Sequence, residues 1–239
     1  MVEPESAGRR EDVLERAHDE YVRRQRRLET DESLRDSNVR IRERTARHYA
    51  RMLDRAGLLP LGARRVIDVG CGDGEFLIRC RRDWGHSGEG LAGIDLMEDR
   101  IEALAGAMPE LDLRTGSADA LPWPDASFDL AHQSMLLSSV LDEALREAIA
   151  GEMRRVVRPG GWVLWYDFIW NPLNRATVGM PKRRIRACFP GWSTVQRKRI
   201  SLAPPLARPL LRVSGRLVGA LEACKVFNLW HLALLQKPL

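Results

Sequence analysis

The sequence has no apolar run close to the roughly 20 residues that a membrane-spanning helix requires. Charged residues make up 30% of its 239 residues, which also argues against a membrane protein. The first residues are acidic and contain no apolar segment of the kind found in signal peptides, so we expect no secretory leader. We find neither an internal repeat nor a low-complexity tract.

Cysteine is scarce as well. The four cysteines show neither metal-binding spacing nor a paired framework; they are Cys71, Cys80, Cys188 and Cys224. Cys71 lies in a glycine-rich segment, where a disulfide would disrupt the turn. We therefore expect reduced thiols and a cytoplasmic location. Because no His, Asp and Glu residues cluster with metal-ligand spacing, we predict no Mg²⁺ or Zn²⁺ site.

The net charge is +5 at pH 7, and arginine supplies most of the positive charge. Charge runs are usually solvated faces, which is the simplest interpretation. A basic protein also suits an anionic acceptor such as a nucleotide sugar, a phosphate or a nucleic acid.

From residue 58 onward, short β-branched runs alternate with amphipathic segments. The patterns predict strands at 65–69, 91–95, 111–115, 128–133, 162–166, 195–202 and 226–235. They predict helices at 75–84, 98–108, 142–157 and 182–188, and a turn at 158–161. Strands that alternate with helices indicate an α/β fold, a largely parallel sheet with both faces covered.

The ends of the chain depart from this alternation. Residues 1–57 predict a helical extension with helices at 11–29 and 39–56, and residues 58–239 predict one cofactor-binding domain. The extension could cover the ligand edge of the sheet as a lid, form a homodimer contact, or simply pack. Within the domain, 171–191 is a basic insertion flanked by Trp170 and Trp192, which could line an acceptor pocket. Residues 206–224 are apolar and partly helical in pattern, and core packing explains them better than a membrane surface does.

A glycine-rich segment directly after the first predicted strand is the strongest local signal. Gly70, Gly72 and Gly74 alternate there and a helix follows, so bare backbone and helix N–H groups can approach a ligand. Asp95 ends the second strand, 25 positions beyond Gly70, where a carboxylate can accept both hydroxyls of a ribose. Glu75 occupies the place of the third glycine of a dinucleotide site, which suits a pyrophosphate poorly. The pattern indicates an adenosine-containing cofactor with an amino acid in place of the pyrophosphate.

At this point the chain resembles the class I S-adenosylmethionine-dependent methyltransferases. The resemblance rests on five blocks in the family's order, at 66–76, 93–96, 116–122, 128–130 and 155–161. It implies a Rossmann-like, seven-stranded sheet of order 3-2-1-4-5-7-6 whose last strand is antiparallel. Segments 133–140, 165–168, 171–172 and 202–208 are similar to a bacterial subgroup associated with glycan or secondary-metabolite biosynthesis.

The resemblance also implies roles for individual residues. The turn of Gly70, Cys71, Gly72 and Gly74 would lie under the methionine and ribose parts of S-adenosylmethionine. Asp68 would lie near its amino group, Asp95 would hold the ribose, and Leu96 would pack on the adenine. Asp119 would bond the adenine amino group beside Ala118, and Gln133 would contact the methionine portion. His48 and Tyr49 of the extension could close over the site.

Methyl transfer to a hydroxyl requires alignment, exclusion of water and removal of a proton. His132 and Asp167, near the ends of the fourth and fifth strands, are the candidate bases, although strand alternation could turn His132 into the core. The predicted reaction is methyl transfer to a small-molecule or sugar acceptor, yielding S-adenosylhomocysteine. The alternatives are an RNA methyltransferase, a non-catalytic cofactor-binding scaffold and, less favoured, an NAD-dependent oxidoreductase. Against RNA, the fourth strand lacks the Asn/Asp-Pro-Pro-aromatic signature and no RNA-binding module is recognisable.

Overall fold

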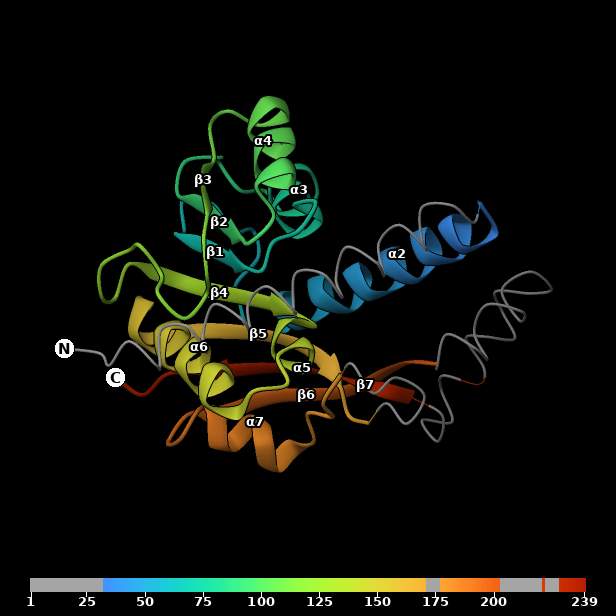
Figure 1. Cartoon of the computed structure of the whole chain (residues 1–239), viewed down its shortest axis with the longest axis vertical. Coiled ribbons are helices and arrows are strands. Elements are labelled where there is room, and N and C mark those ends of the chain that lie inside the picture. Colours follow the sequence, from blue (N-terminus) through green and yellow to red (C-terminus); the bar gives the residue numbers. More distant parts are fainter. Residues whose placement is uncertain (1–31, 171–176, 203–220, 222–227) are drawn as a thin grey trace.

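The computed structural model describes residues 32–170, 177–202, 221 and 228–239, and its centre is a seven-stranded sheet (Figure 1). The strands run in the order β3-β2-β1-β4-β5-β7-β6, the order that the resemblance implied. The first five strands in this order, β3, β2, β1, β4 and β5, are parallel to one another. Strand β7 runs antiparallel to both β5 and β6. The predicted fold class and strand order are therefore confirmed. The bounds are β1 Val66–Val69, β2 Leu91–Asp95, β3 Asp112–Thr115, β4 Phe128–Ser134, β5 Val157–Phe168, β6 Ser193–Leu202 and β7 Asn228–Gln236.

Helices cover both faces of the sheet, because the central strands are apolar on both sides. On one face, α2 (Glu32–Arg55), α3 (Glu75–Arg82) and α4 (Glu98–Ala107) bury Leu53, Leu77 and Leu104 in one core cluster. On the other face, α5 (Leu136–Ser139), α6 (Glu143–Val156) and α7 (Lys182–Cys188) bury Leu137 and Met153 in a second cluster. Because successive side chains of a strand point to opposite faces of the sheet, the central strands contribute residues to both clusters.

The helix α2 is longer than predicted. The helix predicted at 39–56 is wrong at its start, because α2 already begins at Glu32. A short polar residue such as Ser33 does not end a helix when good helix formers flank it. The C-terminal half of α2 lies against the sheet, where Gln196 of β6 donates a hydrogen bond to the Met52 carbonyl oxygen over 2.9 Å. Figure 1 shows the rest of α2 extending away from the sheet.

The predicted turn at 158–161 is wrong, because these residues belong to β5. Gly160 adopts a φ of 71°. Its N–H donates to the Pro238 carbonyl oxygen over 3.2 Å, and Lys237 N–H donates to the Gly161 carbonyl oxygen over 2.9 Å. The register against β4 shifts between Phe128 and Leu130, so the strand absorbs the Pro-Gly-Gly segment as an irregularity. The C-terminal residues thus pair with this part of β5, and a local sequence pattern cannot predict such a pairing.

Several predictions fall outside the described residues. These are the helix at 11–29, most of the segment at 206–224, and residues 171–176 of the basic insertion, together with Cys224. The other three cysteines are buried and free. Among the helices of the described ranges, none combines the length and apolar composition that crossing a bilayer requires.

Candidate functional site

The glycine turn connects β1 to α3 at the carboxyl edge of the sheet. Gly70, Gly72 and Gly74 have φ values of 73°, 52° and 70°, which strain residues that carry a Cβ. The N–H groups of Gly70 and Cys71 both donate to the Ile94 carbonyl oxygen, over 2.9 and 3.0 Å, and so tie the turn to β2. A Cβ on Gly70 would lie 3.2 Å from Leu136. The turn is therefore held in one conformation, and its backbone lies at the carboxyl edge of the sheet without side chains on the three glycines.

Asp95, at the end of β2, is fixed by that same turn. The Gly72 N–H donates to Oδ2 over 2.8 Å, and the Met97 N–H donates to Oδ1 over 3.1 Å. Burial raises the pKa of Asp95, and the two backbone hydrogen bonds oppose this shift. Each carboxylate oxygen has two acceptor sites, so each keeps one after these bonds. Asp95 can thus accept two further hydroxyl donors.

A cavity of about 460 Å³ opens between this edge and α2, within the range of small-molecule sites. Predicted site residues that line it are Tyr49, Asp68, Gly70, Cys71, Gly72, Asp95, Leu96, Ala118 and His132. Four predicted residues do not line it: Gly74, Asp119, Gln133 and Asp167. The half-buried His48 does not line it either, and its Nδ1 lies 3.3 Å from the Lys198 ammonium.

Gly74 and Asp119 have other contacts. A Cβ on Gly74 would lie 2.4 Å from Leu104, so this glycine allows α4 to pack closely against the start of α3. The Asp119 carboxylate accepts a hydrogen bond from the Ser117 hydroxyl. Ser117 itself lines the cavity, so Asp119 borders the cavity wall without being part of it.

Gln133 and Asp167 are both buried and hold α5 in place. The Leu136 N–H donates to Gln133 Oε1 over 3.1 Å, and the Ser138 N–H donates to Asp167 Oδ2 over 3.1 Å. These N–H groups lie in the first turn of α5, where no intrahelical carbonyl can accept them. Burial raises the pKa of Asp167 to about 7, and its hydrogen bonds to Ser138 oppose the shift. The structure therefore gives both side chains a helix-positioning role that strand-end patterns could not reveal.

His132 faces the cavity and is paired with Asp68. The strands β1 and β4 are neighbours, and their register places Asp68 opposite His132. His132 Nδ1 lies 2.7 Å from Asp68 Oδ1, and the imidazole stacks on Phe76 with ring centroids 3.7 Å apart. A carboxylate only accepts hydrogen bonds, so Nδ1 carries a proton, and in the neutral imidazole Nε2 is then the nitrogen with the lone pair. Among the described residues Nε2 has no hydrogen-bond partner.

Aromatic side chains form the wall around this histidine. Tyr49 of α2 lies edge-on to His132 at 5.3 Å and to Tyr166 at 6.0 Å. Trp230 of β7 stacks on Tyr166 at 6.5 Å and lies 4.7 Å from Phe168. Burial raises the pKa of the Tyr49 phenol well above its ordinary value, and nearby Tyr166 adds to the shift.

Tyr166, Phe168 and Trp230 line the cavity and were missed as site residues in the sequence analysis. Trp170 and Trp192, which we expected at an acceptor pocket, do not line it. Trp170 is 62% exposed, and Trp192 packs against Phe189.

The arginines at the cavity are engaged by carboxylates. Glu75 accepts from Arg42 over 3.1 Å and from Arg79 over 3.0 Å. Asp73 pairs with Arg100 over 2.8 Å. Within the described ranges no three His, Cys, Asp or Glu side chains cluster in a way that could hold a metal ion.

Comparison with known proteins gives a consistent result. Residues 66–161 match a family model described as a methyltransferase domain. This segment includes the glycine turn, Asp95 and the Asp68–His132 pair. Residues 66–161, less than half of the chain, are thus similar to a methyltransferase domain, in agreement with the resemblance to class I S-adenosylmethionine-dependent methyltransferases.

Similar proteins carry related names. The ubiquinone biosynthesis O-methyltransferase of Paracidovorax citrulli is 36% identical over 115 residues, which are 46% of this chain and 45% of that protein. The 27-O-demethylrifamycin SV methyltransferase of Amycolatopsis mediterranei is 32% identical over 144 residues, 57% of this chain and 50% of that protein. The chain thus spans about half the length of these curated relatives.

A solved structure shares the fold. The S-adenosylmethionine-dependent methyltransferase from Mesorhizobium loti has a TM-score of 0.58 at 18% identity, over 77% of this chain and 95% of that one.

The cavity of the methyltransferase domain fits the cofactor of its family. Asp95 has acceptor sites left for a ribose, and the glycine turn brings backbone close without side chains. Leu96, 38% exposed, and the small Ala118 offer an apolar place for an adenine. S-adenosylmethionine is thus the cofactor that this domain is built to bind.

Proposed function

We propose that this protein transfers a methyl group from S-adenosylmethionine to a hydroxyl oxygen of a small-molecule acceptor. The observation that carries the proposal is the buried Asp68–His132 pair at the wall of a cavity that also contains Asp95. The relatives named above, one a ubiquinone biosynthesis O-methyltransferase, support a small-molecule acceptor and methylation at oxygen. A role in glycan or secondary-metabolite biosynthesis stays a prediction from sequence.

When bound, S-adenosylmethionine supplies a methyl group on a positively charged sulfur, which leaves as the neutral thioether of S-adenosylhomocysteine. In this proposal His132 Nε2 takes the proton of the acceptor hydroxyl while the oxygen attacks the methyl carbon. Asp68 holds the imidazole through Nδ1 and stabilises the positive charge that His132 gains, as a carboxylate does for other histidine bases. The aromatic wall excludes water from the reacting atoms.

The extension at 1–57 would cover the reaction in this scheme. Its described part, α2, contributes Ile41, Thr45 and Tyr49 to the cavity wall. Tyr49 lies edge-on beside the His132 ring, with ring centroids 5.3 Å apart, so a movement of α2 would change the access of the acceptor to His132. We therefore propose a lid role for α2 and leave its dimer role as a prediction.

Two measurements test the proposal. Asp95→Ala should weaken calorimetric binding of S-adenosylhomocysteine at least about 30-fold, since a carboxylate that bonds two hydroxyls contributes about 2–3 kcal/mol or more. Asp99→Ala, which removes an exposed carboxylate outside the cavity, is the matched control and should leave this affinity within about twofold. Equal affinity in wild type and Asp95→Ala would contradict the cofactor site.

The second measurement follows a labelled methyl group into a panel of hydroxylated small molecules. His132→Gln should lower the transfer rate by about 10²-fold or more while cofactor affinity stays within about threefold, because general-base catalysis contributes about 10²–10⁴. Label that enters RNA and no small molecule would overturn the proposal, and so would a His132→Gln variant of full activity.

A further inference from the structure

Three residues that line the cavity have buried polar atoms without a hydrogen-bond partner in the described part of the chain. Thr45 Oγ1, His132 Nε2 and Trp230 Nε1 are buried and make no hydrogen bond within the described ranges. Their residues come from α2, β4 and β7, are 6%, 2% and 5% exposed, and all line the cavity. A buried polar atom without a partner costs about 1–3 kcal/mol. Three such atoms at one cavity point to a ligand that supplies the missing partners.

The three atoms demand different partners. An indole N–H only donates, so Trp230 requires an acceptor oxygen on the ligand. In the neutral imidazole His132 Nε2 has the lone pair, because Asp68 fixes the proton on Nδ1, so Nε2 can accept a hydrogen bond from a ligand hydroxyl. The Thr45 hydroxyl can serve either way. A ligand with one hydroxyl and a second oxygen satisfies the two strict demands.

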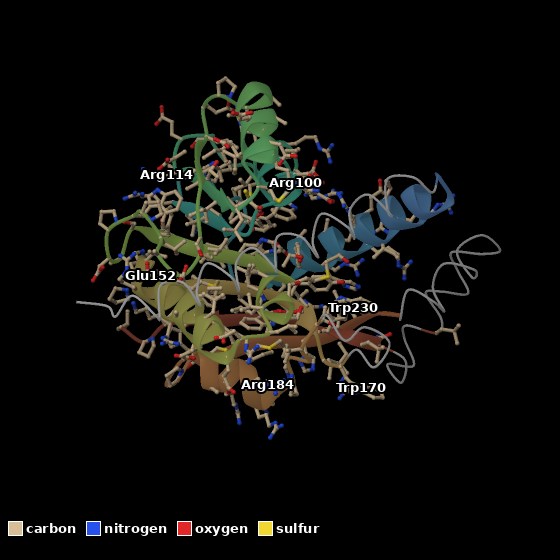
Figure 2. The ribbon with its side chains drawn as sticks, viewed as in Figure 1. Arg100, Arg114, Glu152, Trp170, Arg184 and Trp230 are labelled. Atoms are coloured by element: carbon tan, nitrogen blue, oxygen red, sulfur yellow. The ribbon has the colours of Figure 1, made fainter. Side chains whose placement is uncertain are left out.

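The wall between these atoms selects for ring shape. Tyr49, Tyr166, Phe168 and Trp230 line the cavity as a connected set, with neighbouring centroids 4.7–6.5 Å apart. Such spacing is that of edge-to-face and offset-stacked ring pairs, which a planar aromatic ligand extends. Figure 2 marks Trp230 near the place where α2 meets the C-terminal strands.

Charge at the cavity points to a neutral ligand. Arg42 and Arg79 are both held by Glu75, and Arg100 is held by Asp73. An anionic ligand would compete with Glu75 and Asp73 for these guanidinium groups and would be repelled by their carboxylates. The basic surface of the protein therefore gives no guide to the acceptor in this cavity.

We propose that the acceptor is a neutral, planar aromatic ring that carries a hydroxyl and a second oxygen. The ring lies against the Tyr49, Tyr166 and Trp230 wall, its hydroxyl bonds His132 Nε2, and its second oxygen accepts from Trp230 Nε1. This assignment rests on the proposed function for the role of His132. It also adds Trp230 as a specificity-determining residue for the reaction.

Catechol, phenol and cyclohexane-1,2-diol are the probes, titrated by NMR into the full chain saturated with S-adenosylhomocysteine. We expect catechol to bind at least about tenfold more tightly than cyclohexane-1,2-diol, which keeps both oxygens and loses the ring. Trp230→Phe keeps a ring and loses the N–H, so it should weaken catechol about three- to tenfold and leave phenol unchanged. Trp170→Phe, at an exposed tryptophan outside the cavity, is the matched control and should change neither.

Equal affinity for catechol and cyclohexane-1,2-diol in the wild type would overturn the inference without any variant. A Trp230→Phe variant that binds catechol as tightly as wild type would overturn the role of Nε1, as would equal weakening of catechol and phenol. The proposed function fails separately. Ring-selective binding without methyl transfer would support the inferred aromatic ligand and contradict the proposed methyl transfer. Methylation of aliphatic alcohols alone would support the proposed methyl transfer and contradict the inferred aromatic acceptor.

Discussion

The substitution Gly74→Ala tests why a glycine is present at this position of the turn. Gly70 and Gly72 of the same turn line the cavity, and Gly74 does not. Gly74 has a φ of 70°, and a Cβ there would lie 2.4 Å from Leu104 Cδ2 and 2.6 Å from Cδ1. The left-handed conformation costs a residue with a Cβ about 1–2 kcal/mol. Forcing the buried Leu104 aside costs about 1–3 kcal/mol more, as overpacking does in other cores. We expect a loss of about 2–5 kcal/mol, or roughly 4–20 °C in Tm for a chain of this size.

Two further glycines separate these contributions. Gly57 has a φ of 69° with no atom within 4 Å of a Cβ, so Gly57→Ala should show the backbone cost alone, about 1–2 kcal/mol. Gly106, in α4, has neither a positive φ nor a neighbour, so Gly106→Ala should raise stability by about 0.5–1 kcal/mol. Urea unfolding followed by circular dichroism measures all three variants. A Gly74→Ala variant no less stable than Gly57→Ala would refute the packing argument, and an unchanged Gly57→Ala would refute the backbone argument.

The remaining predictions concern a buried carboxyl group and a half-buried arginine. The pKa of Asp167 is raised from 3.8 to about 7 by burial, so the folded state keeps a proton that the unfolded chain releases, and stability falls as pH rises between these values. Asp167→Asn should remove about 2–4 kcal/mol of this pH dependence between pH 4 and 7, and parallel unfolding curves for both proteins across that range would contradict the assignment. Arg155 donates to the carbonyl oxygens of Trp123 and Leu121 over 2.8 and 2.9 Å. Arg155→Ala should cost about 1–3 kcal/mol by chemical denaturation. Arg158→Ala, at an exposed arginine, should cost less than about 1 kcal/mol. Equal losses of stability for the two variants would contradict the role given to the Arg155 hydrogen bonds.

Much of the fold was predictable because its signals are local. The helix at 182–188 and the strand at 91–95 were predicted with the bounds that the structure has. Most other elements differ by one to three residues at an end, since caps and pairing partners decide where an element stops. The start of α2 and the length of β5 were wrong for the same reason. Pro238 and Lys237, which pair with Gly160 and Gly161, lie 78 and 76 positions away in sequence.

The site residues were also predictable only where their signals are local. Glycines at alternate positions and an acid at the next strand end are local patterns, and they indicated the cofactor. Gln133 and Asp167 share the strand ends with cavity residues, but they point into the core, where they bind the first turn of α5. A strand-end position therefore predicts closeness to the site, while the direction of the side chain depends on the packing of neighbouring elements.

The sequence by itself determined the methyltransferase fold and the donor, because glycine conformations, strand runs and acid spacing act within a few tens of residues. Only the tertiary structure decided which side chains face the acceptor. The register of β1 against β4 brings Asp68 to His132 across 64 positions, and the antiparallel β7 sets Trp230 opposite Phe168. The first pairing depends on β4 lying beside β1, and the second on the insertion of β7 between β5 and β6; both are long-range arrangements that no local pattern encodes.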